Sequence, residues 1–223
     1  MLLKVQDLTK SFKINEEEIE ILSNISFSVN SNEIISIYGY SGSGKTTLLN
    51  ILSGLVSADK GDIFFDNKIL LSSSDFFEFR KNQLGIVFQE DYLLEEFTAI
   101  ENIMLPCLIS GYSKKESYAK SYELLEKFDL LHIKDAYSNI LSGGEKQRLS
   151  ILRAIINNPR IILADEPTGS IDEFNKEKIF SLFKDIIKEY NSSILIVTHD
   201  NNVSKISNKI LNLSRGKIRE YDE

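Results

Sequence analysis

The sequence has few cysteines, little positive charge and no long apolar runs, and each scarcity excludes a class of protein. Its 223 residues include one cysteine, Cys107, so no internal disulfide can form. No group of Cys and His residues has the spacing of a zinc site, which suits a reducing cytosol. Cys107 is therefore expected to be a small buried hydrophobe.

Long apolar stretches are also missing. No run approaches the roughly 20 residues that a helix needs to cross a bilayer. The first residues, 1–7, have the pattern of a strand rather than of a signal peptide with a basic and then an apolar segment. We expect a soluble protein, whose role at a membrane would require a partner.

Positive charge is outnumbered by negative charge. The chain has 26 Lys and Arg residues against 33 Asp and Glu residues, a net charge of −7. Without a basic stripe, repulsion by phosphates disfavours a nucleic-acid partner. The chain also lacks internal repeats, low-complexity tracts and linkers, so residues 1–223 are predicted to form a single domain.

The pattern of apolar residues predicts an α/β fold. Continuous apolar runs separated by helical patterns favour a parallel sheet covered on both faces, preceded by N-terminal antiparallel strands. A mostly helical lobe, residues 90–158, is predicted as an insertion in a core of residues 1–89 and 159–223. The predicted strands include residues 25–29, 34–38, 63–65, 84–88, 161–164 and 194–198, and the predicted helices include residues 75–81, 117–128 and 176–190. The buried face of the helix at 117–128 is predicted to contain Tyr118, Tyr122, Leu125 and Phe128.

A phosphate-binding loop follows the strand predicted at residues 34–38. Gly39, Gly44, Lys45 and Thr46 satisfy the pattern G-x-x-x-x-G-K-[ST]. Backbone N–H groups and a helix N-terminus attract polyphosphate, Lys45 would reach the β- and γ-phosphates, and the Thr46 hydroxyl is placed to ligate Mg²⁺. The bland alternative is a glycine turn followed by a chance Lys-Thr. Alone, the loop indicates only a nucleoside triphosphate, and the residues predicted to bind it are Gly39, Tyr40, Ser41, Gly42, Ser43, Gly44, Lys45, Thr46 and Thr47.

Two adjacent acids, Asp165 and Glu166, follow the apolar run at residues 161–164. The carboxyl end of a buried strand is where ligands of open α/β sheets bind. In a P-loop enzyme, the first acid binds Mg²⁺ through water and the second orients or deprotonates the attacking water. We therefore predict Asp165 as a metal-binding residue and Glu166 as the general base, in preference to a solvated junction between strand and loop.

A helix with an unusual start follows Leu141. Ser142 and Glu145 form an S-x-x-E capping box, which taken alone indicates only a well-capped helix. Gly143 and Gly144 lie inside the first turn, where glycine costs stability unless something must approach the backbone closely. A second phosphate contact would explain the glycine pair.

These stretches, together with Gln89, residues 170–172 and residues 198–200, occur in the order seen in ATP-binding-cassette ATPases, which the sequence resembles over essentially its whole length. The resemblance implies a P-loop NTPase (RecA-like) core with an antiparallel β subdomain and an inserted α-helical subdomain. It also implies that Phe12 stacks on adenine. Gln89 would sense Mg²⁺ and the γ-phosphate, and His199 would donate a hydrogen bond to the γ-phosphate.

The same resemblance implies an ATP-dependent dimer of two identical subunits. Ser142, Gly143 and Gly144 of each subunit would contact the ATP bound to the other subunit, and Asp172 would couple the two sites. The implied partners are thus a second copy of this chain and an integral membrane permease. The protein would then lie on the cytoplasmic face of the cell membrane, attached through that permease.

Two segments, residues 97–106 and 163–169, are similar to those of the lipoprotein-releasing, macrolide-export and antimicrobial-peptide-export group. The implied function is ATP hydrolysis that powers export or extraction of a lipoprotein, peptide or drug. Tyr40, Lys146 and Ile171 differ from the residues usual in the family, and none of these differences removes a ligand or a proton carrier. A regulatory ATPase of the cell-division type, which signals through a membrane partner without moving a substrate, remains the alternative.

Overall fold

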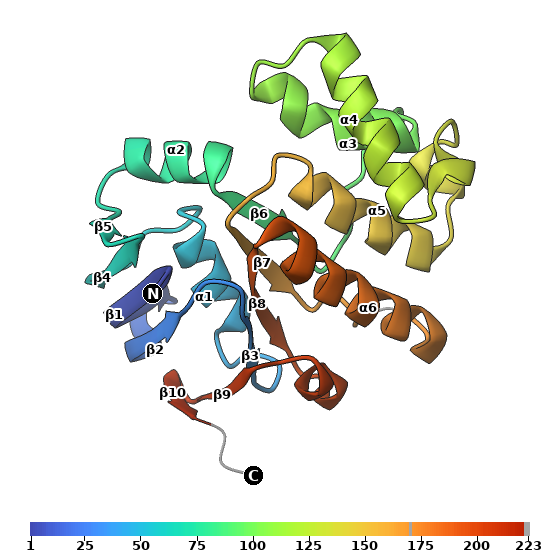
Figure 1. The fold of residues 1–223 in the computed structure, drawn as a ribbon. Helices are drawn as coiled ribbons and strands as arrows, with labels where there is room; N and C mark the ends of the chain where they lie inside the picture. The colour runs from blue at the N-terminus through green and yellow to red at the C-terminus, as the bar shows by residue number, and fades with distance from the viewer. Residues whose placement is uncertain (170, 221–223) are drawn as a thin grey trace.

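The computed structural model describes residues 1–169 and 171–220, which form two sheets surrounded by helices (Figure 1). The first sheet is antiparallel, with the strand order β2-β1-β4-β5, and the second has the order β10-β9-β3-β8-β7-β6. The strands of the first sheet are β1 (Leu3–Ile14), β2 (Glu17–Val29), β4 (Lys60–Phe65) and β5 (Lys68–Ile69). Those of the second are β3 (Ile34–Tyr38), β6 (Leu84–Val87), β7 (Ile161–Asp165), β8 (Ser193–Thr198), β9 (Lys209–Ser214) and β10 (Lys217–Glu220).

The second sheet is parallel except for its edge strand β10, which pairs with β9 in the antiparallel direction. All residues of β7 and β8 are buried. Ile161 and Leu163 join one apolar cluster, whereas Ile162 and Ala164 join the other, because successive side chains of a strand point to opposite faces. The continuous apolar runs therefore arise from strands that are covered on both faces, as predicted.

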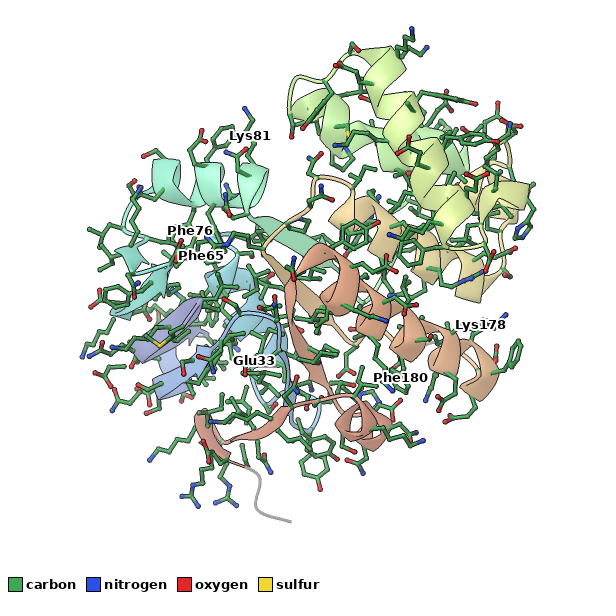
Figure 2. All side chains as sticks on the ribbon, in the orientation of Figure 1. Glu33, Phe65, Phe76, Lys81, Lys178 and Phe180 are labelled. Carbon is green, nitrogen blue, oxygen red and sulfur yellow. The ribbon has the colours of Figure 1, made fainter. Side chains whose placement is uncertain are left out.

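Helices fill both layers beside this sheet. On one face, α1 (Lys45–Leu52) packs against both sheets, and its Leu48 and Leu52 are fully buried. On the other face lie α5 (Gly143–Ile155) and α6 (Glu173–Tyr190). Helix α6 has a buried side and a solvent-facing side. Phe180 is 2% exposed, whereas Lys178, two residues earlier, is exposed to solvent (Figure 2).

Between β6 and β7 the chain forms three helices, and α3 and α4 stand apart from the large sheet in Figure 1. The helices beyond those of the sheet layers are α2 (Ser73–Asn82), α3 (Ala99–Ile109) and α4 (Lys114–Lys127), with the short 3₁₀ segments η1 (Leu131–Ile133), η2 (Ser138–Ile140) and η3 (Asn201–Lys205). Cys107 on α3 is fully buried, as expected. No helix of the described residues is long and apolar enough to cross a membrane.

The buried face of α4 differs from the one predicted. Tyr118 is 43% exposed, whereas Ser117 and Ser121 are fully buried together with Leu124 and Leu125. The prediction followed the large apolar residues, but the helix turns its small serines inward and packs closely against α3. Small side chains at a helix contact permit such a short distance between the helix axes.

Capping boxes begin four of the helices. In each, a Ser or Thr side chain accepts a hydrogen bond from a backbone N–H three residues later, and the acidic side chain there accepts one in return. The pairs are Ser72 with Asp75, Thr98 with Glu101, Ser113 with Glu116, and Ser142 with Glu145. The sequence analysis had identified only the last pair, and the others show that the helical region is specified by strong local start signals.

We expect Ser113→Ala to lower the free energy of unfolding by about 1 kcal/mol, because the Glu116 N–H loses its acceptor. Ser113→Asp keeps an acceptor at the helix start and serves as the matched control. Urea denaturation followed by circular dichroism measures both. Equal stability of the alanine variant and the parent would show that this cap does not contribute.

Candidate active site

The phosphate loop, Glu166 and His199 meet at the carboxyl ends of the parallel strands β3, β7 and β8, as expected for an open α/β sheet. A cavity of about 410 Å³ opens there. It is lined by Ile21, Ser41, Gly42, Gly44, Lys45, Thr46, Thr47, Gln89, Glu166 and His199. Tyr40 and Ser43 line a neighbouring cavity of about 320 Å³, which shares three residues with the first.

The loop before α1 depends on glycine at its last position. Gly44 has a φ of +100°, a conformation that side chains with a Cβ rarely adopt. A Cβ at this residue would also lie 3.0 Å from side-chain atoms of Ile21 and Leu22. The helix that follows has no acidic residue in its first turn and no side-chain cap, so its positive end faces the cavity uncompensated. This geometry favours an anion such as a phosphate.

Lys45 lies at the base of the loop and is 7% exposed. Its Nζ donates hydrogen bonds to the carbonyl oxygens of Gly39 (2.7 Å) and Tyr40 (3.2 Å). The same nitrogen is 3.4 Å from Oε1 of Glu166. The loop carbonyls and the carboxylate thus hold a positive charge that is almost completely removed from solvent.

Glu166 is held by groups from β8 and from the residue that follows it. Its Oε2 accepts hydrogen bonds from the Thr198 hydroxyl (2.8 Å) and the His199 N–H (3.1 Å), and its Oε1 lies 2.9 Å from Nδ1 of His199. Burial raises the pKa of this carboxyl, but the hydrogen bonds from His199 and Thr198 outweigh burial and leave the pKa below its ordinary value. The carboxylate is therefore ionised and oriented.

The backbone of Glu166 is strained, with a φ of +45°. Its N–H donates to the carbonyl oxygen of Val197 at 2.9 Å, which ties this conformation to β8. Strained residues held in place by their surroundings cluster at functional sites. Here the strain turns the carboxylate toward Lys45 and His199.

Asp165 differs from its neighbour in its surroundings. Burial raises the pKa of this carboxyl, a hydrogen bond from Thr46 lowers it, and the charge of Glu166 raises it, with a net increase. Its Oδ1 is buried and has no hydrogen-bond partner among the described residues. An unpaired carboxylate oxygen beside a threonine hydroxyl suits Mg²⁺, which prefers oxygen ligands. Thr46 and Asp165 therefore fit the predicted metal.

The start of α5 does not belong to this cavity, and its two glycines have different surroundings. A Cβ on Gly144 would lie 2.6 Å from the Asn175 side chain. Asp172 accepts hydrogen bonds from the side-chain amide of Asn175 (2.7 Å) and from its backbone N–H (3.0 Å). A Cβ on Gly143 would meet nothing within 4 Å. Packing against α6 thus accounts for Gly144, whereas Ser142 and Gly143 are exposed to solvent.

One further predicted residue lies outside both cavities. Phe12, on β1, is 38% exposed, lines neither cavity, and has the Lys10 ammonium 5.2 Å from its ring centre. Ser170 is outside the described residues. Conversely, Ile21 lines both cavities and was not predicted. The sequence around Ile21 gives no sign of a role at the site, because its place there depends on how the antiparallel sheet lies beside the phosphate loop.

Comparisons with known proteins identify the family of the chain and support its fold. A model of the ABC transporter family matches residues 22–169. The chain belongs to this family. The lipoprotein-releasing system ATP-binding protein LolD of Treponema denticola is 42% identical to this ABC chain, over 97% of the chain and 96% of LolD. The putative hemin import ATP-binding protein HrtA of Staphylococcus haemolyticus is 39% identical, over 98% of this chain and 99% of HrtA.

Solved ABC cassettes share the fold over the whole chain. The dimeric bacterial ABC transporter cassette MJ0796 has a TM-score of 0.89 and 35% identity, with 100% of both chains covered. The same values describe its dimeric post-hydrolysis state, bound to ADP and phosphate. The predicted fold class is confirmed: the core is that of a P-loop NTPase. The chain is a nucleotide-binding ABC ATPase.

We expect Lys45→Met to weaken ATP binding by about tenfold or more, which corresponds to about 1.4 kcal/mol, because the loop loses its charge toward the phosphates. Equilibrium titration with a fluorescent ATP analogue measures this affinity. Lys68→Met, at a side chain that is 74% exposed, is the control. Unchanged affinity of the Lys45 variant, with an intact fold by thermal unfolding, would contradict the role of this residue.

Proposed function

We propose that this ABC ATPase works as a homodimer that powers an integral membrane permease, for the extraction or export of a lipoprotein or a related peptide or drug. One observation carries the dimer: the open N-terminus of α5, at Ser142 and Gly143, lies outside the cavity that holds Lys45, Glu166 and His199. A second copy can bring its own α5 to the nucleotide. The dimeric MJ0796 cassette and the LolD relatives support the proposal.

In the proposed reaction, the loop amides and Lys45 bind the phosphates of ATP and stabilise the charge that spreads over the phosphoryl oxygens. Glu166 orients the attacking water and accepts its proton, and its ionised state suits a base. Nδ1 of His199 donates to Glu166, so Nε2 can donate to the γ-phosphate only in the form of the imidazole that carries a proton on both nitrogens. Gln89, at the rim of the cavity, responds to the γ-phosphate.

Thr46 and Asp165 are the residues that would hold Mg²⁺, which neutralises phosphate charge when it is bound. Phe12 would contribute an aromatic face to the adenine. It is sufficiently exposed for stacking, although it lies outside both cavities. Asp172 caps α6 next to the α5 start, through Asn175, and is thus placed to transmit a change between the two sites of a dimer.

We expect Glu166→Gln to bind ATP with nearly the parent affinity, to hydrolyse it at least about 10²-fold more slowly, and to accumulate as an ATP-bound dimer, because only the base is lost. Phosphate release and light scattering measure turnover and mass. Glu177→Gln, at an exposed acid of α6, is the control. Parent-like turnover in the Glu166 variant would refute the base, and a purely monomeric ATP-bound form would refute the dimer.

A largely apolar groove of about 550 Å³ suits the permease. It lies between α2 and β6 on one side and α3 and α5 on the other. Phe77, Tyr92 and Ile109 line it, and they are 56%, 60% and 76% exposed. Exposed apolar surface of this kind marks an interaction site. We propose that an apolar helix of the permease, extending from the membrane, binds here and holds the ATPase at the cytoplasmic face.

We expect Ile109→Glu to abolish most of the stimulation of ATPase activity by the permease while the basal rate stays unchanged, because a charge would be buried in the docked groove. The measurement compares ATPase rates with and without vesicles that contain the co-expressed permease. Tyr118→Glu, on an exposed part of α4, is the control. Full stimulation of the Ile109 variant would place the permease elsewhere.

A regulatory ATPase that signals without transport would use the same catalytic residues. The relatives named for lipoprotein release favour transport over this alternative.

A further inference from the structure

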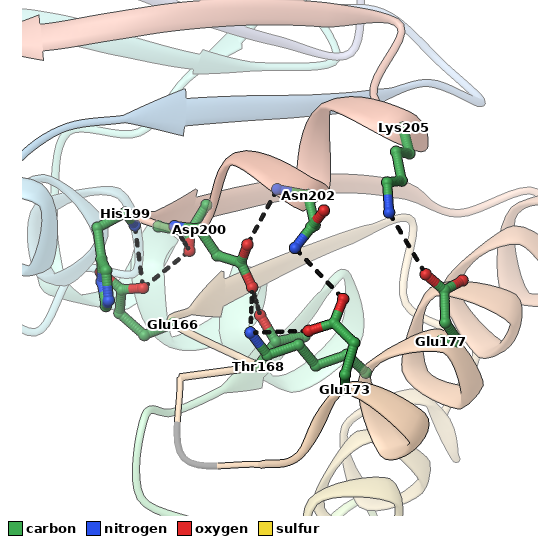
Figure 3. A network of polar contacts seen from close by, with 10 residues as sticks. Glu166, Thr168, Glu173, Glu177, His199, Asp200, Asn202 and Lys205 are labelled. Atoms are coloured by element: carbon green, nitrogen blue, oxygen red, sulfur yellow. Dashed lines mark hydrogen bonds and ion pairs between the residues drawn. The ribbon is translucent and has the colours of Figure 1, made fainter.

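Asp200 is a polar hub directly after His199. Its Oδ2 accepts hydrogen bonds from the Lys176 ammonium (2.8 Å) and the Thr168 hydroxyl (3.3 Å), and its Oδ1 accepts one from the Asn202 N–H (2.9 Å). These groups come from three segments: the loop after β7, the first turn of α6, and the start of η3. Figure 3 shows Thr168 and Asn202 next to Asp200. One carboxylate thus joins parts of the chain that are distant in sequence.

Hydrogen bonds also connect Asp200 to Glu166, the proposed base. The N–H of Asp200 donates to the Thr198 hydroxyl oxygen (2.9 Å), and that hydroxyl donates to Oε2 of Glu166 (2.8 Å). Lys176 is therefore connected to Glu166 through Asp200 and Thr198. His199 lies between Thr198 and Asp200 in the chain, and its Nδ1 is 2.9 Å from Oε1 of Glu166.

The ion pair of Lys176 and Asp200 is more buried than the neighbouring ion pair of Lys205 and Glu177. The side chain of Lys176 is 19% exposed and that of Asp200 is 11% exposed. By contrast, Lys205 and Glu177 bridge the same two elements, η3 and α6, at 3.6 Å with side chains that are 56% and 59% exposed. Exposed pairs contribute little to stability, whereas removing one partner of a desolvated pair leaves a costly charge.

The electrostatics agree with the geometry. The hydrogen bond to Asp200 raises the pKa of Lys176. Burial raises the pKa of Asp200, but the hydrogen bonds from Lys176 and Asn202 outweigh burial, so its pKa lies below the ordinary value. Both groups are therefore charged at neutral pH, and each stabilises the charge of the other.

We propose that Lys176 and Asp200 are positioning residues for ATP hydrolysis. Their ion pair fixes the turn at residues 198–200 against α6, and the turn holds His199 and the strained Glu166 in the arrangement described above. The pair also connects this turn to the start of α6, which Asp172 caps. The inference rests on the proposed roles of Glu166 and His199, and it adds two residues that do not line the cavity of Lys45 and Glu166.

The test compares Lys176→Met with Lys176→Arg, which keeps the charge, and with Lys205→Met, which breaks the exposed pair on the same boundary. We expect Lys176→Met to lower kcat by about tenfold with ATP affinity and KM within about twofold, because a small misplacement of reacting groups slows the chemical step. Lys176→Arg should recover most of the rate. Lys205→Met should behave as the parent.

A second measurement, NMR of the histidine side chains, does not depend on ATP hydrolysis. The sequence has two histidines, His132 and His199, so imidazole NMR signals of the nucleotide-free protein are simple to assign. We expect Lys176→Met to shift the His199 signals and leave those of His132 unchanged, while Lys205→Met shifts neither. If Lys176→Met does not fold, as judged by thermal unfolding, Asp200→Asn replaces it with the same expected results.

Parent-like kcat and unshifted His199 signals in the Lys176 variant would overturn the inference, and so would equal losses in the Lys176 and Lys205 variants. These outcomes are separate from a failure of the proposed base. Glu166→Gln tests that role by itself, and the NMR comparison does not depend on which group activates water.

Discussion

The buried carboxylate of Glu166 is the contact on which the site depends. A charge removed from water is tolerated only when it is paired and hydrogen-bonded, and Lys45, Thr198 and His199 meet this need from two other segments. The loop after β3 and the residues after β8 must therefore lie at the same edge of the sheet as the carboxyl end of β7. The parallel register, with Tyr38 opposite Thr198, places them there.

The rest of the fold makes that register rigid. Strands β7 and β8 are buried along their full length, and α1 is held between the two sheets. Close packing of this kind resists small shifts, so the polar atoms at the strand ends keep their distances. The strained backbone of Glu166 is affordable because its N–H is fixed to β8. Catalytic geometry here is a consequence of a well-packed sheet.

In one copy of the chain, the residues proposed to bind ATP lie in two separate places, so the proposed cycle needs a second copy. The cavity gathers the phosphate loop, Gln89, Glu166 and His199, while the open start of α5 lies outside it. The Lys176–Asp200 pair links the two regions within one chain, since α6 begins beside α5 and ends its first turn at the turn after β8. Packed polar groups thus connect the two regions.

The sequence by itself determined the phosphate loop, the acids Asp165 and Glu166, the capped start of α5 and the family, because each is specified by residues that are adjacent in the chain. The lobe boundaries and the individual roles of the site residues remain predictions. Only the tertiary structure decided that Ile21 lines the site, that Asn175 accounts for Gly144, and that Lys176 meets Asp200. Such contacts join residues far apart in sequence, and no local pattern of side chains specifies which of them will meet.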